Sequence, residues 1–319
     1  MAHEIDLSNG KPAIAYLGND VPWHGLGQSL TKHAPIETWI EEAGFNWNIV
    51  ESNAIYKNGD QEFTFDGKKI LFRSDNQKPL SVVSDSYKTV QPKEVLEFFR
   101  DIVSDSGMYL STAGCLFDGK KYWATAETGN SLVLSTGDKI NGFLLLTSSC
   151  DGTNATSASF VSTRVVCNNT LNVALNEGAN NPKVRVTHRQ VFDATKIKQK
   201  LGLIDQAWDK FKDNILTLQN FKTTDRDARN FITNIVAKDK FATHAEELEI
   251  NRIYSLYAGA GLGSDICRGT GLGILNAFTE KVDHHGSKHS KSSQFWSAAY
   301  GDGAKLKEKV FDELLQIAA

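Results

Sequence analysis

The tract 162–175, STRVVCNNTLNVAL, mixes amides, hydroxyls and one arginine with valine and leucine. A plain core segment would not carry these groups so densely, because buried amides and guanidinium groups need hydrogen-bonding partners. Arg164, Asn168 and Asn169 can instead bind phosphate or sugar oxygens. We therefore expect Arg164 on a sheet face that lines a groove. Asn168 and Asn169 should then lie at the N-terminus of a following helix, where free N–H groups favour an anion.

The same tract also has a purely structural explanation. Arg164 could be buried and paired with a carboxylate, and the two asparagines could cap the helix that follows. Residue types alone do not decide between the two explanations, and both stay open at this point.

Basic and aromatic residues elsewhere extend the ligand-binding hypothesis. Two lysines precede a tyrosine and a tryptophan in KKYW, and arginines precede a lysine-rich stretch at 196–200. Lysine and arginine bind the phosphate backbone, and aromatic rings stack on bases. The predicted nucleic-acid-binding set is Lys120, Lys121, Tyr122, Trp123, Arg164, Asn168, Asn169, Arg185 and Arg189.

The charge distribution favours the same region. The whole chain has a net charge of −3. Residues 1–158 hold 13 Lys/Arg against 20 Asp/Glu, residues 159–222 hold 10 against 5, and residues 223–319 hold 12 against 13. A basic stretch on an acidic chain is a weak indication of a polyanion ligand. A solvated, lysine-rich helix face explains it equally well.

Metal and cofactor motifs are weak in this sequence. The cluster Asp283, His284, His285 and His289 could bind a metal, but histidines are also favoured at the end of a helix, which is predicted there. The glycines of 257–265 follow a predicted helix rather than a strand, so they do not make a dinucleotide-binding loop. No catalytic constellation is recognisable. We expect a non-enzymatic protein without a cofactor or a bound metal.

Composition is that of a globular protein, with 40% hydrophobic and 23% charged residues among 319. The four cysteines stand far apart without a CxxC pair, which is typical of reduced thiols in a cytosol. No apolar run approaches the roughly 18 residues of a membrane span, and no signal peptide is recognisable. We expect a cytoplasmic protein.

Hydrophobic periodicity predicts the elements that must position these residues. A short helix is expected at 35–43, strands at 45–56, 62–73 and 79–85, and a helix at 92–105. The run 62–73 should turn at Asp66–Gly67. A hairpin at 108–128 should turn at Asp118–Gly119. Strands at 140–150 and 157–165 then lead to a helix at 168–175 and a strand at 183–188.

Helices are expected over the rest of the chain, at 191–219, 224–237, 245–258, 269–282 and 302–317. The fold class is therefore α+β, with an antiparallel sheet and packed helices followed by an all-helical C-terminal region. We place a core domain at 1–190 and a helical region at 191–319.

Three separated motifs resemble the phage/plasmid-like family called domain of unknown function 932. They are PWHGLG, LLLTSSCDGTNATSASFVSTRVVCNNTLNVAL, and LNAFTEKVDHH followed by SAAYGDGAKLKEKVF. The resemblance runs from about residue 15 to 315. It implies a protein carried by phages, prophages or plasmids in a bacterial host, without assigning an activity.

The order of helix, hairpin, strand, strand and helix also resembles the core of phage single-strand annealing proteins of the RecT and Erf type. This likeness implies rings or filaments that hold single-stranded DNA. Our leading hypothesis is single-stranded nucleic-acid binding, DNA rather than RNA, or strand annealing in recombination by a homo-oligomer. The alternative is a protein-interaction or structural protein, such as a host-defence inhibitor or an oligomeric scaffold.

Overall fold

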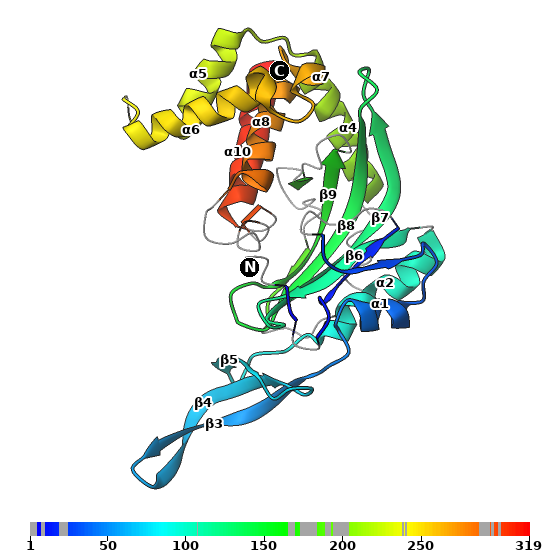
Figure 1. Cartoon of the computed structure of the whole chain (residues 1–319), viewed down its shortest axis with the longest axis vertical. Coiled ribbons are helices and arrows are strands. Elements are labelled where there is room, and N and C mark those ends of the chain that lie inside the picture. The colour runs from blue at the N-terminus through cyan, green and yellow to red at the C-terminus, as the bar shows by residue number, and fades with distance from the viewer. Residues whose placement is uncertain are drawn as a thin grey trace. The chain divides into compact units, whose positions relative to one another are not determined.

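The chain forms two compact units, each built from separate stretches of sequence (Figure 1). Unit 1 comprises Met1–Gly129, Phe143–Ser159 and Lys183–Gly202, and unit 2 comprises Asn130–Gly142, Phe160–Pro182 and Leu203–Ala319. The sequence predicted instead one boundary at residue 190. The structure, a computed structural model, describes residues 5–7, 10–18, 25–106, 108–164, 170–172, 184–188, 193, 204–237, 239, 241–286, 294, 297–298 and 301–319.

The larger sheet has the order β10-β9-β8-β7-β6-β1-β2, and β11 also pairs with β9. Its strands are β1 Ile14–Leu17, β2 Gln28–Leu30, β6 Tyr109–Leu116, β7 Lys121–Val133, β8 Lys139–Ser149, β9 Thr156–Arg164, β10 Thr170–Asn172 and β11 Val184–Val186. β1 pairs with β2 in parallel and with β6 in antiparallel orientation. Helices α1 (Ile36–Glu42) and α2 (Pro92–Ser106) contact each other, and α2 contacts β6.

The hairpin β6–β7 turns where the sequence predicts it. Phe117, Asp118 and Gly119 all have positive φ, which is the backbone that an Asp-Gly pair favours. A Cβ on Gly119 would lie 2.6 Å from Trp47 and 2.8 Å from Arg73, so this turn needs glycine.

A second, three-stranded sheet has the order β3-β4-β5. Its strands are β3 Ile49–Asn58, β4 Gln61–Arg73 and β5 Pro79–Ser84. β5 pairs only with the part of β4 from Lys68 onward, so β3 and the first half of β4 run on as a two-stranded arm (Figure 1). The turn of this hairpin is Gly59–Asp60.

The predicted turn at Asp66–Gly67 is wrong, because β4 continues through it. Gly67 has a φ of 77°, and the pairing with β3 jumps from Asn53–Lys69 to Ile55–Thr64. Residues 65–68 of β4 therefore lie opposite Ala54 alone, as an irregular bulge larger than the usual two residues against one. The Asp-Gly pair marks a place where the strand leaves its register rather than a place where the chain reverses.

The helix predicted at 168–175 is also wrong over the residues that the structure describes there. Thr170–Asn172 forms β10, which pairs antiparallel with β9 through the register Thr170–Thr163. Pairing with a neighbouring strand prevails over the local helical pattern. The strand predicted at 183–188 is confirmed as β11.

The second unit is mostly helical among its described residues. Its helices are α4 Ile204–Asn220, α5 Asp225–Val236, α6 His244–Ser255, the π-helical turn η1 Leu256–Ala260, α7 Ser264–Cys267, α8 Gly271–His284 and α10 Asp302–Ala318. α8 is buried along most of its length and contacts α4, α10 and η1. The mixed α+β fold and its helical C-terminal region are thus as predicted. Of the helix predicted at 191–219, residues 194–203 lie outside the described part.

None of the described helices has the length and apolar character that spanning a membrane requires.

Candidate functional site

The arm, which we define as residues 51–69, is exposed along nearly its whole length. Only Ala54 and Lys69 are not exposed, although two strands of this length would normally pack one face on a core. An isolated two-stranded hairpin is marginally stable at best in water. The arm therefore depends for its folded conformation on the residues at its base, which we call its root. Both of its faces are available to a partner.

One face of the arm carries an aromatic cluster. Tyr56 and Phe63 are paired across the strands, with ring centroids 5.4 Å apart and planes at 22°. Phe65 meets Tyr56 edge-on at 6.5 Å. The three side chains are 51%, 39% and 53% exposed, and Ile55 on the opposite face is 53% exposed. A contiguous group of large apolar side chains on a solvent-exposed hairpin is typical of a protein-interaction surface.

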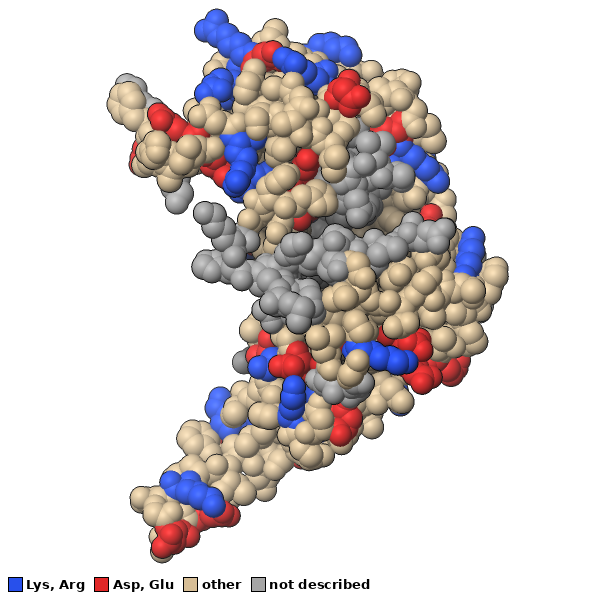
Figure 2. Space-filling view, in the orientation of Figure 1, with Lys and Arg blue, Asp and Glu red and all other residues tan. Residues whose placement is uncertain are grey.

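The charges of the arm are mixed rather than basic. It holds three lysines against four Asp/Glu, a balance of −1. Lys57 pairs with Glu62 at 3.0 Å, and Lys69 pairs with Glu51 at 2.8 Å. Figure 2 shows side chains of both signs at the tip of the arm. This surface lacks the excess of positive charge that attracts a polyanion.

The root of the arm is held by Arg73, the last residue of β4. Its guanidinium is fully buried, forms ion pairs with Asp6 and Asp75, and donates a hydrogen bond to the Asp118 carbonyl oxygen at 3.1 Å. It also lies 4.1 Å from the centre of the Trp47 ring. Burial alone lowers the pKa of Arg73, but the hydrogen bonds with the two aspartates more than offset this and raise it. The cation is therefore a permanent structural anchor.

Tyr122 and Trp123 are corrections to the predicted binding set. Their exposed fractions are 0% and 5%, and the Tyr122 hydroxyl donates a hydrogen bond to the Val90 carbonyl oxygen. Burial raises the pKa of Tyr122 well above its ordinary value. Both rings belong to the core of the first unit and present no face to a base, so neither can stack on nucleic acid in this structure.

Lys120 and Lys121 are half-buried beside the turn between β8 and β9. The Cys150 N–H donates to the Lys120 carbonyl oxygen at 2.9 Å. Burial lowers the pKa of Lys121, and the charge of Asp151 opposes this shift. Two further cations lie at the same hairpin turn, where Lys78 pairs with the Asp118 carboxylate at 3.2 Å and Arg73 donates a hydrogen bond to the Asp118 carbonyl oxygen.

The hydroxyls of the strands on either side of that turn satisfy one another. Ser148 and Thr156 are joined at 2.7 Å, and Thr147 and Ser157 at 3.1 Å. All four are buried. The hydroxyl-rich part of the middle motif is therefore a structural ladder between β8 and β9 rather than a ligand wall.

The remaining predicted binding residues are only partly described. Arg164 ends β9, and Arg185 lies in β11 opposite Ser157, but their side chains lie outside the described part. Asn168, Asn169 and Arg189 lie outside it entirely. Both explanations of Arg164 therefore remain predictions. The expected helix N-terminus is not supported, because β10 begins at Thr170.

The acidic and histidine cluster near residue 283 takes part in structural contacts. Asp283 pairs with the buried Lys307 of α10 at 2.7 Å, and His285 lies 3.7 Å from Glu280. The Glu280 carboxylate accepts a hydrogen bond from the Leu262 N–H at 2.9 Å. Within the described residues, no three His, Cys, Asp or Glu side chains are placed to hold a metal. His289 lies outside them.

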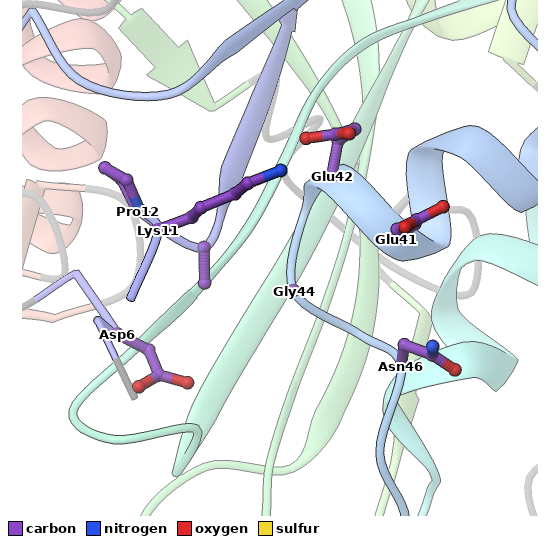
Figure 3. Close-up of a pocket in the computed structure, with 8 residues that line it drawn as sticks. Asp6, Lys11, Pro12, Glu41, Glu42, Gly44 and Asn46 are labelled. Atoms are coloured by element: carbon purple, nitrogen blue, oxygen red, sulfur yellow. The ribbon is translucent and has the colours of Figure 1, made fainter. Parts of the chain in front are cut away.

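A cavity of about 230 Å³ lies between the N-terminal segment and the end of α1 (Figure 3). Figure 3 shows the Lys11 side chain extending toward Glu42, with Asp6 well away from both. The Asp6 carboxylate is already paired with Arg73. The cavity walls also include Glu41 and Asn46, and these groups do not form a recognisable catalytic set.

The fold defines an α+β protein with an exposed β arm. A family model described as "Domain of unknown function (DUF932)" matches residues 79–304, more than half of the chain, so the chain belongs to this family. The arm precedes the matched residues. No curated protein and no solved structure matches the chain significantly.

Sequence reasoning missed the arm as a candidate site. The strands at its position were predicted, but alternation such as Phe63–Thr64–Phe65 usually indicates a half-buried strand. The available signal was the alternation itself, which places aromatic residues on one face of the hairpin and the charged Glu62 and Lys57 on the other.

Proposed function

We propose that the protein is a non-enzymatic, homo-oligomeric scaffold in which the arm joins one copy to another. One observation carries this proposal: the aromatic cluster of Tyr56, Phe63 and Phe65 on an arm that is exposed on both faces. Burying such side chains against protein is favourable by roughly 1.5–3 kcal/mol each. The near-neutral charge of the arm favours a protein partner over a nucleic acid. The proposal includes that a phage or plasmid encodes the protein and that it acts in the cytoplasm of the bacterial host.

Size measurement of the purified protein tests this function. We expect the wild-type chain to sediment as an oligomer and the double variant Tyr56→Ser/Phe65→Ser to sediment as a monomer. Phe241→Ser is the matched control, because Phe241 is 80% exposed but lies outside the arm. A monomeric wild-type chain, or an oligomer unaffected by the arm variant, contradicts the proposal.

Single-stranded nucleic-acid binding or strand annealing is a second candidate, compatible with an oligomer. It is favoured by the balance of +5 over residues 159–222 on a chain of net charge −3. The succession α2, β6–β7, β8 and β9 matches the first four elements of the order that suggested annealing proteins, but β10 stands where that order expects a helix. The likeness is support by analogy alone. The residues proposed to contact phosphate are Lys120, Lys121, Arg164, Asn168, Asn169, Arg185 and Arg189. DNA is proposed ahead of RNA.

Arg164→Ala separates this candidate from its structural alternative. If Arg164 binds phosphate, the variant should melt like the wild type, bind labelled single strands more weakly and show a salt slope reduced by about one charge. If Arg164 holds a buried carboxylate, the variant should lose roughly 3–5 kcal/mol of stability. Absence of binding at low salt by the wild-type protein would remove the candidate.

A further inference from the structure

The outer edge of β3 is an open strand edge whose direction the structure defines. The Ile49 N–H donates to the Gln91 side-chain oxygen at 2.7 Å, and the Gln91 side-chain amide donates to the Ile49 carbonyl oxygen at 3.2 Å. The backbone groups of Ile49 therefore face away from β4. Because this direction alternates along a strand, those of Glu51 and Asn53 face outward as well.

The alternation continues to the end of β3. Between the pairs Asn53–Lys69 and Ile55–Thr64, β3 advances by two residues while β4 contains the whole bulge. Ile55 and Lys57 therefore also direct their N–H and C=O groups outward. Among the described residues, β3 is the last strand of its sheet. Along this edge, within the part of the chain that the structure describes, the Asn53 carbonyl oxygen accepts a hydrogen bond from the adjacent Ser52 hydroxyl at 3.4 Å, which a strand partner readily displaces.

The outward residues are self-complementary in charge. Glu51 and Lys57 stand three residues before and three residues after Ala54. If two copies of β3 pair antiparallel about Ala54, Glu51 of each copy lies opposite Lys57 of the other, and Asn53 lies opposite Ile55. Every outward backbone group of these residues then gains a partner. A partner unrelated to this chain would have no reason to match such symmetry.

We propose that two copies of this chain join through β3, antiparallel and centred on Ala54, to form one continuous six-stranded sheet. This inference rests on the proposed oligomeric function and specifies its partner and register. A row of alternating charge then crosses the sheet. It runs from Glu62 and Lys57 of one copy to Glu51 and Lys69 of the other. The two aromatic clusters lie on the same face, on either side of the paired Ala54 residues.

Neighbouring registers lack this match. Centring on Asn53 places Lys57 opposite Ile49, whose edge groups are already bound by Gln91. Centring on Ile55 places Lys57 opposite Asn53 and Glu51 opposite the turn at Gly59. Neither register pairs the two charges, so the charge pattern selects Ala54 as the centre.

Cysteine cross-linking tests the register directly. In a non-hydrogen-bonded antiparallel pair the two Cα atoms are about 4.5 Å apart, within the range that a disulfide requires. Oxidation of the full-length Ala54→Cys protein with diamide, which takes up the two thiol hydrogens, should give a covalent dimer. Ser52→Cys is the control on the same face, since its two copies would lie about 13 Å apart. Equal cross-linking of both variants, or of neither, overturns the register.

A charge-reversal cycle gives an independent test. Glu51→Lys and Lys57→Glu should each weaken the dimer about tenfold, because each dimer contains the contact twice. The double variant restores opposite charges between copies, so its dissociation constant should return to within about threefold of the wild-type value. If the charges act only within one chain, the double variant should be no better than the single ones. That result overturns the inference while leaving an arm-dependent oligomer, and hence the proposed function, intact.

Discussion

The hairpins β3–β4 and β6–β7 of the first unit both have tight, glycine-containing turns, and they differ in what surrounds them. In β6–β7, the residues Tyr122, Trp123 and Ala124 are buried between neighbouring strands and helices. In β3–β4, the arm has almost no buried residue. The local chemistry of the two hairpins is similar, so the difference lies in the neighbours. A hairpin with neighbours on each side forms core, and one without them offers its edge and faces to other molecules.

The two ends of β4 repeat this contrast within one strand. Arg73 is buried in a network with Asp6 and Asp75, whereas Phe63 and Phe65 near the other end are exposed. The root is fixed by charge-assisted hydrogen bonds, and the tip is left without a covering layer. This arrangement allows the arm to be ordered at its base and still free to bind.

The largest expected effect comes from the same substitution in each hairpin. Tyr122→Ala removes a fully buried ring and should reduce the free energy of unfolding by about 3–5 kcal/mol. Tyr56→Ala should change it by less than about 0.5 kcal/mol when the protein is dilute enough to be monomeric. Urea unfolding measures both. Comparable losses of unfolding free energy in the two variants would show that the arm is packed like the β6–β7 hairpin.

A second pair of substitutions compares the cations. Arg73→Met removes the positive charge that pairs with the buried Asp6 carboxylate and should cost roughly 3 kcal/mol. Lys57→Met breaks an exposed ion pair, with Lys57 71% exposed, and should cost less than about 0.5 kcal/mol in the monomer. Thermal melts at low concentration check both values. A small effect at Arg73 would remove it as the anchor of the arm.

A smaller effect on stability is expected at alkaline pH, and it should come from Cys150, which lies outside the arm. Burial, aided by the charge of Asp151, raises the pKa of Cys150 to about 12. The unfolded chain releases this proton near pH 9 while the folded chain keeps it. Stability is therefore fully present below about pH 9 and falls as pH rises toward 12. Melting temperatures from pH 8 to 11 should fall less steeply in Cys150→Ala than in the wild type, and identical slopes would contradict the assignment.

Several elements could be predicted from sequence because their signals are local. Pro92 and the helical spacing after it predict α2, and Asp118–Gly119 predicts the β6–β7 turn. The same Asp-Gly signal failed at residue 66, where β4 passes through a bulge and then resumes its pairing with β3 instead of reversing. Such pairing depends on residues far apart in the sequence, which local patterns do not reveal.

The candidate site was harder to predict, because exposure depends on tertiary neighbours. Tyr122 and Tyr56 each stand in a strand beside a lysine, yet one is core and the other is surface. The partners of Arg73 include Asp6, which is 67 residues away in the chain. The phosphate-contact residues Arg164 and Arg185 stay predictions, as their side chains lie outside the described part.

Residue-resolved amide hydrogen exchange of the arm tests the central claim most directly. Raising the protein concentration should slow exchange at the outward amides of Glu51, Asn53, Ile55 and Lys57, which gain partners only when two copies pair. The inward amide of Tyr56 should change little, because it faces β4 in both states. If raising the protein concentration leaves the exchange rates of the outward amides unchanged, like that of Tyr56, then β3 does not join copies and the account of the arm is wrong.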